Sequence, residues 1–287
     1  VARQLIKHTN AEVIILDQCD DIKASESGTG LNVNPNGLMS LNALDAELCE
    51  SLKMSGLPRT TLSAETMSGQ KLYKVSLSDT ESINNLALNP GLKIRWADAY
   101  TALRREIPVQ YHQEVTNFDY KDGKISLQVM DKRDTSTRTI NDVDFFIATD
   151  GRYSKMREIV SPATTYFIGV SNFRLLVPDT SGGLFDDMEL LYNPNPVGRI
   201  GKKKMDIKDE FSFCLNSLPR IGVMRMNAVD TSQAMLWFFG NFAVDQEIPE
   251  FAKTKEGLLQ LFSPSDSVVS AKAEYVLQTL SREHGRM

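Results

Sequence analysis

The first seventeen residues combine a helical and a strand-like pattern of apolar positions. Residues 1–8 are apolar at positions 1, 2, 5 and 6, which is the spacing of one helical face. Residues 12–17 then form a β-branched run that closes on Asp17, typical of a buried parallel strand. Helix followed by strand indicates the second half of a βαβ unit. In such a unit an acid at the strand end binds ribose hydroxyls, so Asp17 is a candidate ligand residue, although a purely structural strand end fits it equally well.

The next segment predicts two helices separated by strands. Leucines recur every three to four positions between residues 38 and 48, which predicts an amphipathic helix. Residues 62–77 alternate loosely and predict strands, and residues 95–103 begin a further helix. Arg95 opens that helix, where the helix dipole does not favour a cation. We therefore expect an anionic or carbonyl partner for Arg95, with an ordinary surface position as the alternative.

Residues 109–151 are predicted to be mainly β-structure. Three strand-like runs lie within residues 109–147, with turns near residues 121–123 and 131–136. Within this stretch, the apolar run at residues 143–148 predicts a strand that leads into Asp150 and Gly151.

The residues after this predicted strand combine several ligand-binding features. Asp150 stands at the carboxyl end of the strand, where α/β folds bind ligands. Gly151 lets a backbone approach a ligand closely, and Ser154 is a natural helix N-cap. Lys155 and Arg157 add cations that suit phosphate groups. A plain strand–turn–helix with a capped start is the structural alternative.

Beyond residue 160 the pattern changes to long β-type runs rich in aromatic residues and methionine. Runs at residues 166–177, 219–227 and 234–242 predict an antiparallel sheet. The stretch from residue 254 to residue 284 returns to helical spacing. The domains predicted from these changes are residues 1–160, together with part of the C-terminal region, and a β-sheet domain at residues 161–250. Residues 251–287 are predicted as a helical segment that returns to the first domain.

Composition places the chain among globular proteins and narrows its partners. Of 287 residues, 41% are hydrophobic and 24% charged, with a net charge of −5 and no basic face, so we expect no nucleic-acid partner. The lysines at residues 202–204 precede acidic residues and fit a solvated loop. No apolar run approaches the roughly 18 residues that span a bilayer, and the start lacks the apolar core of a signal peptide.

Cysteine and histidine usage predicts neither a metal site nor a disulfide framework. The three cysteines and three histidines are scattered without metal-ligand spacing. A reducing compartment fits this usage, and we expect a cytoplasmic location.

Taken in order, the motifs resemble the group A flavoprotein monooxygenases, which have the para-hydroxybenzoate hydroxylase-like fold. The family's DGxxSxxR motif is matched by Asp150, Gly151, Ser154 and Arg157. Residues 95–103 resemble the family's FAD-contacting arginine and the helix behind it.

Two further segments carry the resemblance. Residues 30–44 are similar to a family segment that runs from a glycine through Pro-Asn to two leucines, and residues 114–116 resemble the strand whose backbone meets the adenine.

The resemblance implies a fold, a cofactor and a reaction. The fold would be α/β: a truncated FAD-binding Rossmann-like domain of the glutathione reductase type, with an antiparallel β-sheet substrate domain. NADPH or NADH would reduce the FAD, and O2 would then hydroxylate an aromatic or other electron-rich small molecule. The aromatic and methionine side chains that suit such a substrate, half of them expected in the core, are Phe173, Met224, Met226, Trp237, Phe238 and Phe239.

The resemblance also assigns roles to individual residues. Asp17 would bind the adenosine ribose, and the backbone at Val115 would meet the adenine. Asp150 and Gly151 would approach the flavin's phosphates and ribityl chain. The remaining assignments are Arg95, for the pyrophosphate region, and Arg157, for the pyridine nucleotide or support of the motif. No catalytic base is assigned.

The chain departs from the family pattern at three places. The GxGxxG phosphate loop is expected before Val1, and a later Gly-Asp motif is expected after Met287. These segments would lie on a longer polypeptide, outside an ordered region or on another chain. Asp17 stands where the family usually has Glu, which preserves the ribose acceptor.

Three alternative interpretations stay open. A halogenase of this fold usually carries a Trp-x-Trp-x-Ile-Pro segment, which is absent here, whereas a reductase fits as well. A flavin-free fragment could act as a binding module. A protein that binds NAD instead would explain Asp17 but not residues 150–157. The substrate, the choice between NADPH and NADH, and the oligomeric state do not follow from the sequence.

Overall fold

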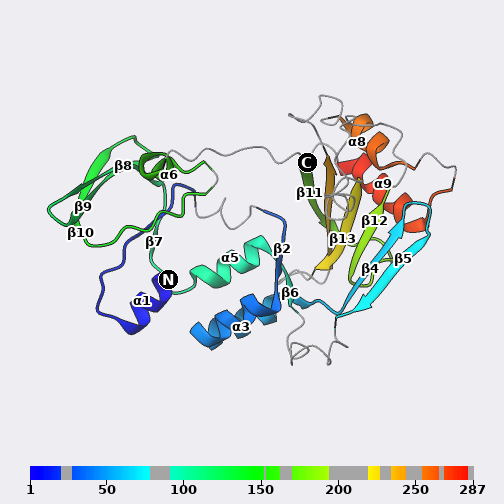
Figure 1. Cartoon of the computed structure of the whole chain (residues 1–287), viewed down its shortest axis with the longest axis horizontal. Coiled ribbons are helices and arrows are strands. Elements are labelled where there is room, and N and C mark those ends of the chain that lie inside the picture. Colours follow the sequence, from blue (N-terminus) through cyan, green and yellow to red (C-terminus); the bar gives the residue numbers. More distant parts are fainter. Residues whose placement is uncertain are drawn as a thin grey trace, which may run out of the picture. The chain divides into compact units, whose positions relative to one another are not determined.

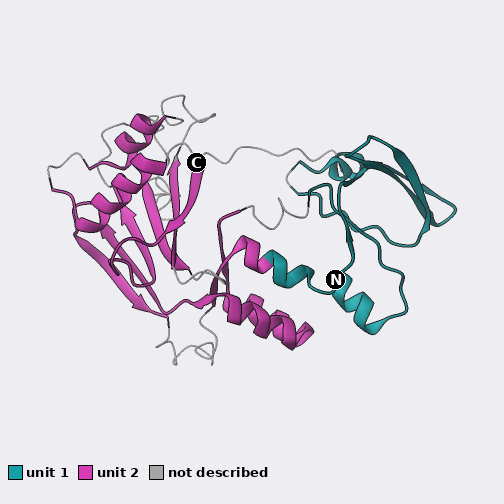
Figure 2. Ribbon diagram, turned by 180° about the vertical axis from the view of Figure 1, so that it is seen from behind, with its two compact units in different colours: residues 1–27, 100–166 teal, residues 28–99, 167–287 magenta. Residues whose placement is uncertain are grey.

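The chain forms two compact units, and neither is a continuous stretch of sequence. Unit 1 contains residues 1–27 and 100–166, and unit 2 contains residues 28–99 and 167–287 (Figure 2). The computed structural model describes residues 1–20, 28–77, 91–151, 153–161, 170–193, 219–226, 234–243, 254–264 and 268–283.

Unit 1 consists of two helices, a short parallel strand pair and a three-stranded antiparallel meander (Figure 1). Strands β1 and β7 pair in parallel, and the meander has the order β10-β9-β8. The elements are α1 (Ala2–His8), β1 (Ile15–Leu16), β7 (Val109–Gln110), β8 (Gln113–Lys121), β9 (Lys124–Asp131), β10 (Thr137–Val143) and α6 (Lys155–Val160).

Most of the predicted elements of unit 1 are confirmed, with one correction. The first helix and the three meander strands lie where the pattern places them, whereas the strand expected at residues 12–17 is limited to β1. The strand predicted at residues 143–148 is wrong. Strand β10 ends at Val143, and residues 145–150 pair with no described strand. Phe145 is 88% exposed, because an apolar run becomes a strand only where a neighbour pairs with its backbone.

Unit 2 is built around a six-stranded sheet of order β11-β14-β13-β12-β4-β5. The β12–β4 pair is parallel and the other pairs are antiparallel. A smaller sheet has the order β2-β6-β3. The strands are β2 (Gly30–Val33), β3 (Leu57–Pro58), β4 (Thr61–Thr66), β5 (Lys71–Ser76), β6 (Leu92–Arg95), β11 (Val170–Pro178), β12 (Met188–Tyr192), β13 (Arg220–Met226) and β14 (Met235–Ala243).

The described parts of the three β-type runs expected after residue 160 do form a sheet, but β4 and β5 complete it from far earlier in the chain. The compact units therefore differ from the predicted segments 1–160, 161–250 and 251–287. The physical reason is that the edge of β12 is paired by a strand distant in sequence, and periodicity within a segment does not identify such a partner.

Helices α8 (Lys255–Phe262) and α9 (Ala271–Glu283) cover one face of the large sheet and form the main core with it (Figure 1). Strand alternation assigns Leu236, Phe238 and Phe242 of β14 to this face. Phe238 is fully buried, and burying such a side chain contributes about 1.5–3 kcal/mol.

The amphipathic pattern around residues 38–48 yields two helices instead of one. Helix α3 (Pro35–Leu44) ends at Asp45, and α4 (Ala46–Ser55) begins there. Asp45 is extended, and its carboxylate accepts a hydrogen bond from the Leu48 N–H at 3.1 Å. Its side chain thus caps the new helix instead of continuing the old one.

Helix α5 (Trp96–Arg104) contributes residues to both units. None of the helices in the described part of the chain has the length and apolar character needed to cross a membrane.

Candidate functional site

Asp17 directly follows β1 and keeps one carboxylate oxygen available. Its N–H donates to the Gln110 carbonyl at 3.0 Å, and its carbonyl accepts from the Gln113 N–H at 2.9 Å. Oδ1 accepts from the Cys19 N–H at 2.9 Å, forming a local turn. No described residue donates to Oδ2, and the side chain is half-buried. Asp17 can therefore accept a further hydrogen bond from a ligand.

The start of β8 connects the Asp17 region to the helix that follows Asp150. Val115 lies in β8 opposite Val129, immediately before a β-bulge. Its neighbour Glu114 pairs with Lys155 of α6 at 2.5 Å and with Lys132 at 3.3 Å. The hydrogen bond from Lys155 is the largest influence on the pKa of Glu114 and holds it below its usual range. Unit 1 thus joins the segments of Asp17, Val115 and Asp150 through contacts that the sequence did not predict.

Asp150 uses its carboxylate to cap helix α6. Oδ1 accepts from the Ser154 hydroxyl at 2.6 Å, and Oδ2 accepts from the Met156 N–H at 3.4 Å. Ser154 is the N-cap and accepts from the Arg157 N–H at 2.9 Å, as predicted. Desolvation raises the pKa of Asp150, but the hydrogen bonds from Ser154 and the Met156 N–H outweigh it and lower the pKa. The structural interpretation of this acid therefore accounts for much of its bonding.

Gly151 has a backbone conformation that only glycine adopts easily. Its φ of +80° lies in the left-handed region. Apart from the adjoining residues, no heavy atom of a described residue lies within 4 Å of the position that a Cβ would occupy. Backbone conformation, and not crowding, therefore requires glycine here. The surface above this turn is open to a ligand.

Arg157 lies in α6 with its side chain half-buried. It belongs to the same short helix that Asp150 and Ser154 cap, so it is placed beside the other motif residues of unit 1. Arg152, in the middle of the motif, lies outside the described residues.

Arg95 belongs to unit 2 and ends β6 instead of opening the helix, which begins at Trp96. This corrects the predicted position by one residue, because Arg95 still pairs with Gly30 in the β2–β6 ladder. Its Nε and NH2 donate to the two carboxylate oxygens of Asp98, both at 2.7 Å. Asp98 is thus an anionic partner of the kind expected for Arg95, and the i,i+3 spacing of the two residues could have identified it.

Sequence reasoning missed a polar cluster near Asp17. The hydroxyls of Tyr100 and Tyr111 lie 3.2 Å apart, and Arg104 donates to Tyr111 at 2.8 Å. Desolvation is the largest cause of a raised Tyr100 pKa, and the hydrogen bond with Tyr111 and the negative charge of Asp17 add to it. Tyr100 and Arg104 share one helical face at i,i+4, but their meeting with Tyr111 depends on the fold.

The aromatic and methionine residues proposed for a substrate divide between the two faces of the large sheet. Phe173 and Phe238 pack with α8 and α9 in the core. Met224, Met226 and Trp237 form a separate cluster on the opposite face, with Phe239 half-buried against it. Met224, Met226, Trp237 and Phe238 are all buried, so more than the expected half of these six side chains are core positions.

This opposite face includes a buried polar atom. Trp237 is 6% exposed, and its indole nitrogen has no hydrogen-bond partner among the described residues. Gly30 of β2 lies against the ring, where any Cβ would overlap it. The side of the cluster that faces β2 is therefore closely packed.

A buried ion pair holds the smaller sheet of unit 2 to the large one. Lys93 of β6 pairs with Asp187, and both side chains are 3% exposed. Asp187 also accepts from the Thr60 hydroxyl at 2.9 Å and from the Thr61 N–H at 2.6 Å. Burial raises the pKa of Asp187, but the hydrogen bond from Lys93 and these donors outweigh it and lower the pKa. The Asp187 carboxylate is satisfied by partners within the protein, which indicates a structural role for the pair.

The described residues contain no group of three or more His, Cys, Asp or Glu side chains that could hold a metal ion. Cys19 is exposed and Cys49 is buried, both as free thiols, whereas Cys214 and the lysines at residues 202–204 lie outside the described residues.

No protein-family model matches the chain, and no curated protein sequence matches it. Solved structures do match its fold. Klebsiella pneumoniae HpxO, crystallised with FAD and uric acid, is 16% identical with a TM-score of 0.69, over 98% of this chain and 62% of that chain. The p-nitrophenol 4-monooxygenase PnpA from Pseudomonas putida DLL-E4 is 14% identical with a TM-score of 0.57, over 92% of this chain and 60% of that chain.

These similarities confirm the resemblance at the level of the fold. The chain has a mixed α/β architecture with several sheets that matches the folds of HpxO and PnpA. It spans about six-tenths of the length of these structures.

Proposed function

We propose that this chain is the larger part of an FAD-dependent monooxygenase that hydroxylates an aromatic or other electron-rich small molecule. The observation that carries the proposal is the fold match over 98% of the chain to a protein crystallised with FAD and uric acid. The motif residues support it independently, because their match to the family pattern depends on the sequence alone.

Unit 1 supplies most of the residues that would hold FAD. Asp17 retains a free carboxylate oxygen for a ribose hydroxyl, and the backbone at Val115 would meet the adenine. The open surface at Gly151 would admit the flavin's phosphates and ribityl chain, with Asp150 beside it. Arg157 would position a pyridine nucleotide or support the motif. These residues fit a dinucleotide in a truncated Rossmann-like domain.

Unit 2 would supply the pyrophosphate contact and the substrate surface. Arg95 is held by Asp98, which fixes the orientation of the guanidinium that the resemblance assigns to the pyrophosphate. The half-buried Phe239, supported by the buried Met224 and Trp237, would present an apolar surface to an aromatic ring.

The division of labour follows from these positions. FAD, when bound and reduced by NADPH or NADH, supplies the chemistry that activates O2. The residues of this chain bind and orient the cofactor and exclude water from the substrate face. The free thiols Cys19 and Cys49 support a cytoplasmic setting.

A second candidate function is a flavin-free binding module. The capping bonds of Asp150 favour it, since they explain this acid without a cofactor. They do not explain the open left-handed turn at Gly151, which a bound flavin would use. Another flavoenzyme, such as a reductase or a halogenase-like enzyme, would share the cofactor site and differ only at the sheet face.

The experiment that tests the proposal is a visible absorbance spectrum of the complete purified protein, before and after incubation with FAD. We expect the two absorption bands of bound oxidised flavin. A panel of phenols and purines, uric acid and p-nitrophenol included, should then be screened for faster NADPH or NADH oxidation. A protein that stays colourless with excess FAD would overturn the enzyme proposal and favour the binding module.

A further inference from the structure

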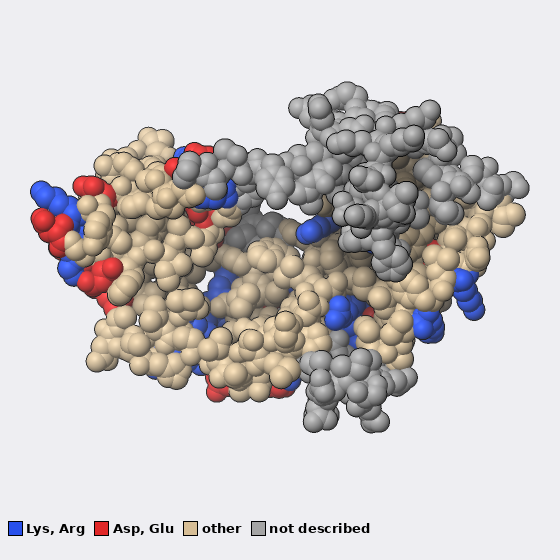
Figure 3. Space-filling view, in the orientation of Figure 1, with Lys and Arg blue, Asp and Glu red and all other residues tan. Residues whose placement is uncertain are grey.

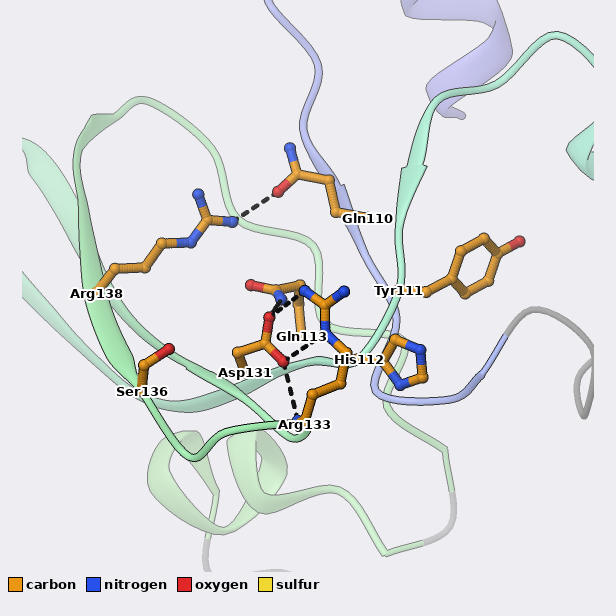
Figure 4. A pocket seen from close by; sticks show the side chains of 8 residues that line it. All are labelled: Gln110, Tyr111, His112, Gln113, Asp131, Arg133, Ser136 and Arg138. Atoms are coloured by element: carbon orange, nitrogen blue, oxygen red, sulfur yellow. Dashed lines mark hydrogen bonds and ion pairs between the residues drawn. The ribbon is translucent and has the colours of Figure 1, made fainter.

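Unit 1 contains a polar pocket that the proposed cofactor residues do not line. It lies where β7 passes into β8 and where the β9–β10 turn folds over them (Figure 4). Its volume is about 480 Å³, and it opens to solvent. The lining residues are Gln110, Tyr111, His112, Gln113, Asp131, Arg133, Ser136 and Arg138.

The strong hydrogen-bond acceptors of the pocket are already used. Asp131 accepts from Gln113 at 2.8 Å, and from the Nε and NH2 of Arg133 at 3.0 and 2.5 Å. The hydrogen bonds from Arg133 hold the pKa of Asp131 well below its usual range, so it stays ionised. The side-chain oxygen of Gln110 accepts from Arg138 at 2.6 Å. A ligand with many donors would therefore find few acceptors here.

Donors remain in excess. A guanidinium group carries five N–H donors. Arg138 gives one nitrogen to Gln110, and the NH1 of Arg133 makes no hydrogen bond with a described residue. The Gln110 amide nitrogen is similarly uncommitted. Figure 4 shows Arg138 reaching across to Gln110 while Asp131 and Arg133 meet between them. Two guanidinium groups and one carboxylate line the pocket, and Asp134 lies near enough to Arg133 to interact with its charge.

The pocket wall is held in a costly backbone conformation. His112 has a φ of 60° and Thr135 a φ of 59°, both in the left-handed region. The His112 N–H donates to the Cys19 carbonyl at 3.1 Å, and its own carbonyl accepts from the Lys132 N–H at 2.8 Å. These bonds fix the backbone of the junction from which Gln110 and Gln113 extend.

The excess of donors is local and not part of a basic surface. On the face drawn in Figure 3, acidic and basic side chains of the described residues are intermixed. Lys124 pairs with Asp144 elsewhere on the meander, which leaves little uncompensated charge there. The guanidinium donors without a described partner therefore distinguish this pocket from the rest of the meander surface.

We propose that this pocket binds a phosphate monoester, with the phosphate between Arg133 and Arg138 and the Gln110 amide as a third donor. Arginine matches the geometry of phosphate oxygens in a paired fashion, and a phosphate monoester brings three acceptors and up to two charges. The volume leaves room for an organic group attached to the phosphate. None of Asp17, Val115, Asp150 and Gly151 lines the pocket, although backbone hydrogen bonds join Asp17 to Gln110 and Gln113 beside it.

The test is a calorimetric titration of the complete protein with inorganic phosphate, at an ionic strength kept constant with chloride and with FAD present in excess. We expect binding in the millimolar range. Arg138→Gln should weaken it about tenfold, because it removes a charged fork. Gln110→Glu should weaken it at least as much, because it adds a negative charge to the pocket without changing its shape. Lys121→Gln, an exposed charge loss on the β8–β9 turn, should leave the affinity unchanged.

The other outcomes of this titration also test the proposed phosphate site. Equal losses in all three variants, unchanged affinity in Arg138→Gln and Gln110→Glu, or no phosphate binding would overturn the proposal. AMP should bind and adenosine should not. If AMP binds more tightly than inorganic phosphate, the natural ligand is a nucleotide. If the two affinities are equal, the natural ligand is a smaller phosphate ester. Displacement of AMP by FAD would assign the pocket to the cofactor and also overturn it. If the protein takes up no flavin but still binds phosphate, the proposed flavin function is overturned and the proposed phosphate site is not.

Discussion

Asp150 in the capped turn of unit 1 and Asp187 in the buried ion pair of unit 2 make similar hydrogen bonds in different surroundings. Both carboxylates accept hydrogen bonds from backbone N–H groups and hydroxyls. Asp187 is 3% exposed and has a buried lysine as its counter-ion, whereas Asp150 is exposed and stands next to an open glycine turn.

The difference shows how to separate structural from ligand-binding polar groups. A buried network must satisfy itself, because an unpaired charge in the interior is strongly destabilising. An exposed network can keep capacity for a ligand at little cost, because water satisfies it in the meantime. Asp187 belongs to the first kind. The free oxygen of Asp17 and the open surface at Gly151 belong to the second.

The largest effect is expected from Asp187→Asn. Lys93 would remain buried without its counter-charge, so unit 2 should lose about 3–5 kcal/mol of unfolding free energy. Both tryptophans lie in unit 2, so fluorescence-monitored urea unfolding of the complete protein reports on it. Asp186→Asn is the matched control, since Asp186 is exposed and should change stability by less than about 0.5 kcal/mol. Equal effects of the two variants would contradict the structural role of the pair.

The same pair should make unit 2 sensitive to acid. The folded-state pKa of Asp187 is lowered, so its contribution is fully present above the unfolded-state pKa of about 3.9 and is lost as the pH falls further. Urea midpoints measured by fluorescence between neutral pH and about pH 3 should therefore decline more steeply in the parent protein than in Asp187→Asn. Parallel pH profiles would show that other carboxylates dominate.

A pair of glycine variants separates backbone strain from flavin contact. Gly151 and Gly123 have φ values of +80° and +79°, and a Cβ would meet nothing within 4 Å at either. Alanine should cost about 1 kcal/mol of stability at both positions. Only Gly151→Ala should also weaken FAD binding, by roughly tenfold, because the methyl group would project towards the cofactor. Flavin titration followed by absorbance measures this, and equal FAD affinities would remove Gly151 from the cofactor site.

Helix caps provide a smaller and independent comparison within unit 2. Asp45 caps α4 through its side chain, whereas Asn34 begins α3 without a side-chain cap bond. Asp45→Ala should therefore cost about 1 kcal/mol and Asn34→Ala only a few tenths. Thermal unfolding followed by circular dichroism distinguishes them. If Asn34→Ala proved the more damaging, the break between the two helices would need another explanation.

The smallest effect is expected for the exposed pair between Lys155 and Glu114. Lys155 is 60% exposed, so its attraction to Glu114 is screened by water and salt. A double-mutant cycle with Lys155→Gln and Glu114→Gln should show weak coupling at low salt and none at about 1 M salt. Coupling that persists at high salt would mean that the contact between α6 and β8 is more buried than it is here.

Local patterns predicted the elements more reliably than their partners. The helix at residues 95–103 and the strand runs of the meander follow from periodicity, and Ser154 caps its helix as its residue type suggests. The strand predicted at residues 143–148 failed because it has no paired neighbour among the described strands. For Arg95 an anionic or carbonyl partner was predicted, and the structure identifies it as Asp98, at an i,i+3 spacing that the sequence already contains.

By itself, the sequence determined the local conformations and the residue types of the candidate site. These depend on dihedral preference, side-chain periodicity and short-range capping, all of which act within a few residues. Only the tertiary structure decided that β4 joins β12, that Lys93 meets Asp187, and that Gln110 and Arg138 line one pocket. These contacts join positions far apart in the chain, and they are selected by the packing of the whole core and not by any single segment.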